Sequence, residues 1–239
     1  MSRARILSIW VSLLVLTGVT VLAPAAHAGP PLICWPFDIG HAKSLPWAST
    51  GRWNSPKTDY NVASLSKDTL ALLTPNTPVI VRMETLRRAT IYASKDPRIA
   101  DQLLSLLQTR AVDAEAKGRP DALAWFDAGY LVEAYKQKGL ADLAAIDSHR
   151  HLASTLDGYA WVKKAIELRG GDAEMEFAAA LITADRARQA EREAHWRKAV
   201  AGASDGSPLA TNLVTHCQMF GLRATAMAEL RAQSGSPRE

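Results

Sequence analysis

Apolar residues recur at steps of three and four along most of the chain, and this spacing predicts amphipathic helices from Asn61 onwards. Several helix starts carry a capping side chain followed by proline, as in Thr77-Pro78, Asp96-Pro97 and Ser207-Pro208, and Gly118 is placed as a helix stop. We expect helices over about 62–73, 79–90, 97–117, 120–138, 140–146, 158–168, 172–200 and 208–227. No alternating strand pattern of useful length accompanies them. The predicted fold is therefore all-α, an antiparallel helix array with short connections.

The stripes within these helices predict which side chains are buried. In the third helix the inward stripe contains Leu103, Leu106 and Leu107, and Val112 continues it. The last helix has a single stripe that runs from Leu209 to Met227 and includes Cys217, Phe220 and Ala224. The segment 185–200 is highly charged, so we expect it to face solvent except at Trp196.

Residues 29–61 differ from everything that follows. Five prolines forbid a long helix there, and tryptophans and other aromatic residues stand between them, including Trp35, Trp47 and Trp53. We expect an irregular arm that packs on a helical body of residues 62–234, with 235–239 as a disordered tail. Exposed tryptophans that stack on a sugar or a peptide are the alternative interpretation of the same segment.

The first 28 residues have the form of a secretory signal peptide. Arg3 and Arg5 precede an uncharged apolar run over 6–22, and Ala26-His27-Ala28 is a small-x-small cleavage pattern before Gly29. An uncleaved N-terminal anchor is the alternative, because the run is close to the length that spans a bilayer. We expect an exported protein, periplasmic or secreted, that meets the membrane only if this segment is retained.

Removal of the leader changes the charge balance. It holds two of the 28 basic residues, so the exported part has 26 against 24 acidic residues, a net charge of +2. Such a small excess gives no support for binding to nucleic acid or to anionic membranes.

Both cysteines, Cys34 and Cys217, lie in the exported part. An oxidising compartment favours a disulfide between them, with two unpaired thiols as the alternative. A bond that closes so long a loop contributes on the order of 4–5 kcal/mol in the chain-entropy model.

The stretch 124–129, Ala-Trp-Phe-Asp-Ala-Gly, resembles the opening of a tetratricopeptide repeat, in which the glycine lets two helices approach closely. The run 162–168, followed by Asp172-Ala173-Glu174, is similar to the end of one such repeat and the start of the next. The resemblance covers about Met83 to Ile182. Ala128, Val132 and Gly170 depart from the pattern, and the copies are not spaced at 34 residues. The resemblance implies stacked helix pairs and names no ligand.

No catalytic motif, metal-binding set or cofactor fingerprint emerges. Ser64-x-x-Lys67 has the spacing of a serine nucleophile beside an amine but lacks the other elements that such enzymes need. The five histidines of the exported part form no ligand pattern, and we expect them at the surface or at helix caps. We expect the carboxylates of Asp127, Glu133 and Glu174 on helix surfaces as well.

A helical array of this kind points to a scaffold that binds a protein or peptide of the cell envelope, since stacked helices present binding surfaces without reactive groups. Arg82, Arg87 and Arg88 put three cations on one helix and are a candidate contact patch, with ordinary solvated charge as the alternative. The competing hypothesis is a small-ligand carrier or enzyme with a pocket between the helices and the aromatic arm, where Trp35, Trp47 and Trp53 lie.

Overall fold

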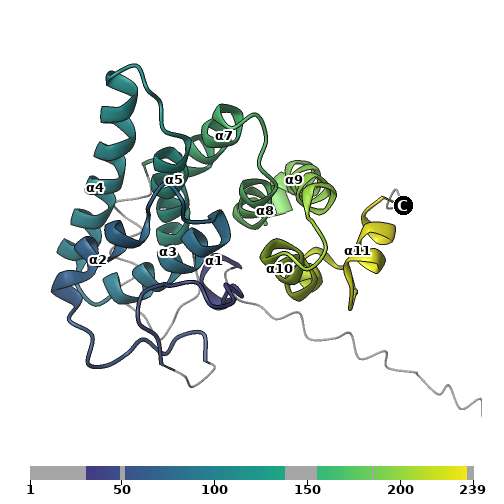
Figure 1. The fold of residues 1–239 in the computed structure, drawn as a ribbon, viewed down its shortest axis with the longest axis horizontal. Coiled ribbons are helices and arrows are strands. Elements are labelled where there is room, and N and C mark those ends of the chain that lie inside the picture. Colours follow the sequence, from purple (N-terminus) through teal and green to yellow (C-terminus); the bar gives the residue numbers. More distant parts are fainter. Residues whose placement is uncertain (1–30, 49–51, 138–154, 185, 236–239) are drawn as a thin grey trace, which may run out of the picture.

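The computed structural model describes residues 31–48, 52–137, 155–184 and 186–235, and over these ranges the chain is all-α (Figure 1). The predicted helix over 140–146, the leader and the tail lie outside the described residues. The elements in chain order are α1 (Pro31–Cys34), η1 (Val62–Ser64), α2 (Leu65–Leu72), α3 (Val79–Ala93), α4 (Pro97–Ala116), α5 (Ala122–Lys136), α7 (Gly158–Leu168), α8 (Ala173–Ile182), η2 (Arg186–Arg188), α9 (Gln189–Gly202), α10 (Pro208–His216), η3 (Cys217–Phe220) and α11 (Met227–Ser234).

Three helices, α3, α5 and α8, form the centre of the molecule. Every residue of α5 from Ala124 to Tyr135 is buried, and so is every residue of α8 from Met175 to Ile182. Figure 1 shows α2 and α4 on one side of this centre and α9, α10 and α11 on the other. A helix that is apolar on all sides requires neighbours on all sides, and the surrounding helices supply them.

Two glycines bring α5 and α7 into close contact. A Cβ atom added at Gly129 would lie 2.6 Å from the carbonyl oxygen of Gly158, and one added at Gly158 would lie 2.5 Å from the carbonyl oxygen of Gly129. The close helix approach expected at Gly129 is therefore present, and its partner is the first residue of α7.

Two helices predicted as continuous are broken. The predicted 172–200 helix ends at Ile182, where the Thr183 hydroxyl bonds back to the Ala179 carbonyl, and α9 starts afresh at Gln189. The predicted 208–227 helix tightens into η3 and stops at Gly221, whose φ of 70° belongs to the left-handed region. The stripe that sequence analysis extended to Met227 thus runs through two helices.

Most predicted caps are present, and one is wrong. Asn61, Asp96 and Ser207 each accept a hydrogen bond from an amide in the first turn of the following helix. Thr77 does not cap α3, because its hydroxyl donates instead to the Leu72 carbonyl at 2.7 Å. The Ile80 amide of α3 donates to the Glu174 side chain, which comes from α8.

Burial agrees with the predicted pattern at some positions and departs from it at others. Trp196 and Cys217 are buried as expected, whereas Leu106 and Val112 on α4 are 40% and 46% exposed. The segment expected to face solvent except at Trp196 also buries Ala199 and Val200. The buried face of α4 is formed by Ala100, Leu103, Leu104, Leu107 and Ala111, so it is rotated around the helix relative to the predicted stripe.

The arm lies across the helices. Leu32, Ile33, Phe37 and Leu45 are buried in the same core as α3, α5 and α8. Asp38 and Asn212 of α10 are joined by two hydrogen bonds, one from the Asp38 amide at 2.9 Å and one to its carbonyl at 2.8 Å. These residues of the arm are therefore part of the folded domain.

Candidate functional site

The three arginines expected at the surface of α3 lie in or near the interior. Arg82 and Arg87 are 0% exposed, and the side chain of Arg88 is 19% exposed. The expectation of an accessible cationic patch is therefore corrected: the two buried guanidinium groups have no contact with solvent. The expectation was wrong because both arginines are paired with buried carboxylates. Arg82 pairs with Asp127, which is brought to it by helix packing, and Arg87 pairs with Glu84 on its own helix.

Arg82 pairs with Asp127 of α5 at 2.5 Å, and its Nε donates to the Thr77 carbonyl at 3.0 Å. A further bond joins Arg82 to the Thr74 carbonyl. Burial raises the pKa of Asp127 to about 6 although Arg82 opposes this change. Asp127 is thus an interior residue, not one of the surface carboxylates that we expected, and with Arg82 it fixes the loop between α2 and α3.

Arg87 and Arg88 tie the arm to α3 through Glu84. Glu84 accepts bonds from Arg87 Nε at 2.7 Å, Arg88 Nε at 2.7 Å and the Phe37 amide at 3.0 Å. Arg87 also donates to the carbonyl of Ile33 at 3.1 Å, and Arg88 donates to that of Leu45 at 2.6 Å. Burial opposes ionisation of Glu84, but Arg87 and Arg88 outweigh it and lower the pKa of this carboxyl.

The three tryptophans of the competing pocket hypothesis contact two parts of the body. The Trp35 ring lies 6.1 Å from that of His216 on α10. The Trp47 ring lies 5.0 Å from the Arg87 guanidinium, and the Trp53 carbonyl accepts a bond from the same arginine at 2.9 Å. All three are half-buried, and Trp35 packs at a different place from Trp47 and Trp53.

The two cysteines are free thiols in the structure, which corrects the expected disulfide. The segments that carry them meet, but they do so through the rings of Trp35 and His216. The Cys217 sulfur faces the Ala224 carbonyl at 3.9 Å. Burial raises the pKa of Cys34 to about 11, against the opposing charge of Arg87, so this side chain is a neutral thiol at physiological pH.

A hydrogen-bonded chain that sequence analysis missed joins α7, α8 and α9. The Tyr159 hydroxyl lies 2.7 Å from His195 Nε2, and His195 Nδ1 bonds to the Glu176 carboxylate. Lys198 pairs with the other oxygen of Glu176 at 3.0 Å. The available signal was Glu176 itself, a carboxylate within the apolar run 175–182. His195, which we expected at the surface or at a cap, is buried here.

This chain has the order of hydroxyl, imidazole and carboxylate that is found in nucleophilic relays. Burial and the neighbouring Glu191 raise the pKa of Tyr159, however, so its phenol stays protonated. Nearby cations lie against the ring, with Lys163 Nζ at 4.8 Å and the Arg188 guanidinium at 5.1 Å from its centroid. The arrangement therefore acts as a clamp between three helices rather than as an activated nucleophile.

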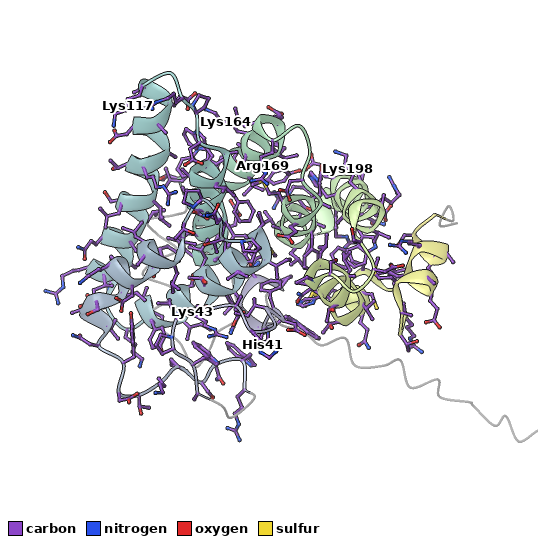
Figure 2. The ribbon with its side chains drawn as sticks, viewed as in Figure 1. His41, Lys43, Lys117, Lys164, Arg169 and Lys198 are labelled. Atoms are coloured by element: carbon purple, nitrogen blue, oxygen red, sulfur yellow. The ribbon has the colours of Figure 1, made fainter. Side chains whose placement is uncertain are left out.

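A cleft of about 300 Å³ opens where the starts of α3, α5 and α8 converge. Its walls are the loop 75–78 with Val79, the side chain of Leu123, and three charged residues at the α7–α8 junction, namely Arg169, Asp172 and Glu174. Figure 2 labels Arg169 at this junction. None of these lining residues comes from the aromatic arm.

Charges of both signs are ordered around the cleft. Arg169 pairs with Asp172 at 2.9 Å, and Asp172 caps its own helix by accepting from the Glu174 and Met175 amides. The Glu174 carboxylate accepts from the Ile80 amide at 3.1 Å, and burial raises the pKa of this side chain. The lining is therefore polar and holds its shape through helix caps, which suits it to a polar ligand such as a peptide segment.

Two features are absent from the described part of the chain. No group of three or more His, Cys, Asp and Glu side chains is placed there to hold a metal ion. None of the helices described is both long enough and apolar enough to cross a membrane.

Comparison of the chain with protein-family models, with curated proteins and with solved structures finds no match.

Proposed function

We propose that this is an exported helical scaffold that binds a peptide segment of another cell-envelope protein in the cleft between the starts of α3, α5 and α8. The observation that carries the proposal is the cleft itself, whose walls come from three separate parts of the chain. Export rests on the form of residues 1–28.

The rigidity of the walls supports this function. The loop 74–77 is held from behind by the buried Arg82–Asp127 pair, and the opposite wall is held by the Arg169–Asp172 pair. A binding site whose shape is already fixed loses less conformational entropy when a ligand binds. Helix α5 packs against α7, and α8 packs against α9. These pairs support the part of the proposal that describes the scaffold as tetratricopeptide-like.

The competing hypothesis, a small-ligand carrier or enzyme with a pocket beneath the arm, has less support. The apolar side chains of the arm, including Leu32, Ile33 and Phe37, pack into the core. Of the tryptophans that would line such a pocket, Trp35 packs on His216, whereas Trp47 and Trp53 both contact Arg87.

The proposal is tested by selecting peptides from a displayed library on the purified protein beginning at Gly29. Binding of each selected peptide is then measured by calorimetry. Asn76→Trp places a large side chain on the exposed rim of the cleft and should weaken binding at least tenfold. His41→Trp, which introduces the same side chain at an exposed arm residue labelled in Figure 2, is the control and should have no effect.

Two results would contradict this function. One is a selection that yields no binder, and the other is a set of binders that Asn76→Trp and His41→Trp affect equally.

A further inference from the structure

The charges that line the cleft do not cancel. Arg169 and Asp172 neutralise each other at 2.9 Å. Over the described residues, Glu174 makes no ion pair with a lysine, arginine or histidine, and its carboxylate accepts from main-chain amides at the start of α3. The lining thus has one net negative charge, and Glu174 carries it.

Burial raises the pKa of the Glu174 carboxyl, and the negative charge of Asp172 adds to the effect, whereas the Ile80 and Val79 amides and Arg169 oppose it. These amides lie at the positive end of α3 and offset part of the Glu174 charge, but burial outweighs them. A cation placed in the cleft would favour the ionised form, because an opposite charge within a few ångströms stabilises a carboxylate.

The cations behind the cleft walls are already paired. Arg82 is bound to Asp127 at 2.5 Å, and Arg110 lies 3.7 Å from Asp121, which caps α5. Among the described lining residues, Glu174 is therefore the charged side chain that has no ion-pair partner.

We infer that the peptide segment bound by the cleft presents a lysine or arginine side chain, whose cationic end pairs with Glu174. The inference rests on the proposed function and names the chemistry of the partner. Charge complementarity carries it: a net negative lining takes a positive side chain. A cleft of about 300 Å³ is at the small end of ligand sites, so it suits one extended side chain with its adjacent peptide groups.

The test uses two acetylated and amidated pentapeptides, Gly-Gly-Lys-Gly-Gly and the same peptide with norleucine in place of lysine. Norleucine keeps the aliphatic chain and removes the charge. Binding to the protein beginning at Gly29 is followed by NMR titration. A hydrogen bond to a charged group contributes about 1.5–3 kcal/mol, so the lysine peptide should bind at least tenfold more tightly.

Two variants separate the role of Glu174 from nearby charge. Glu174→Gln keeps an acceptor for the Ile80 amide and should remove the preference for lysine. Glu167→Gln, at an exposed carboxylate on α7 outside the lining, should leave the preference unchanged. The preference should also weaken with added salt and at acid pH, where Glu174 becomes protonated.

The outcomes separate the two proposals. Equal affinity of the wild-type protein for both pentapeptides, with binding lost in Asn76→Trp, would overturn the charge inference and leave the proposed function standing. Binding that Asn76→Trp does not change would overturn both. A lysine preference that survives Glu174→Gln would also refute the role assigned to this residue.

Discussion

Replacement of Glu84 by glutamine should destabilise the protein more than any other single charge removal that we consider. Glu84 accepts four hydrogen bonds, two from Arg87, one from Arg88 and one from the Phe37 amide. Glutamine has the same size but is neutral and turns an amide group toward the two guanidinium groups. Because Arg87 is 0% exposed, its charge would remain buried and unpaired. Loss of one partner of a buried pair costs about 3–5 kcal/mol.

The assay is guanidinium chloride unfolding of the protein beginning at Gly29, followed by far-UV circular dichroism. Glu115→Gln is the control, because the Glu115–Lys164 pair is 44% and 36% exposed and such pairs contribute about 0–1 kcal/mol. Trypsin should also cut Glu84→Gln faster after Arg52 and Lys57, which are exposed arm residues. A loss of less than about 1 kcal/mol in Glu84→Gln, equal to that of Glu115→Gln, would refute the view that this network holds the arm.

Three further predictions concern the interior. Burial raises the pKa of Asp127 from 3.8 to about 6. The stabilising effect of Asp127 relative to Asp127→Asn is therefore full below pH 3.8 and is lost as the pH rises through 6. The difference in unfolding free energy between the two proteins should fall over this window, with a slope of at most about 1.4 kcal/mol per pH unit. Gly129→Ala places a Cβ 2.6 Å from the Gly158 carbonyl and should cost about 1–3 kcal/mol, whereas Gly235→Ala, with 3.5 Å to its nearest neighbour, should be close to neutral; equal unfolding midpoints would contradict the close approach. Tyr159→Phe removes the hydroxyl that pairs with His195 and should lower the unfolding free energy by about 1–3 kcal/mol. A double-mutant cycle with His195→Gln should give a coupling energy above about 0.5 kcal/mol. Unfolding free energies that are strictly additive in this cycle would contradict the clamp.

The helical class and most helix starts could be predicted from the sequence because their signals are local. Asp96 and Ser207 cap the helices that follow them, and Gly118, with a φ of 67°, ends α4 as expected. The signal at Thr77 failed because two other bonds compete with it. The Thr77 hydroxyl bonds to the nearby Leu72 carbonyl, and Glu174 of α8, which is distant in the sequence, accepts from the Ile80 amide at the start of α3.

The candidate sites were less predictable, because burial of a charge depends on its partner. Arg82 is interior because Asp127, 45 positions away, faces it across the α3–α5 contact. The cleft is built from parts of the chain that lie far apart, so spacing along the sequence carries no sign of it. The expected disulfide depended on the geometry of two distant segments, and the structure turns the Cys217 sulfur toward Ala224.

The bonds between Asp38 and Asn212 join residues 174 positions apart. Asp38 therefore cannot complete its contacts until the chain has been made as far as Asn212. Contacts over such separations form late, because the intervening chain must first be brought together. The arm of a chain built in this way stays without these contacts during most of synthesis, as the proposed export before folding would require.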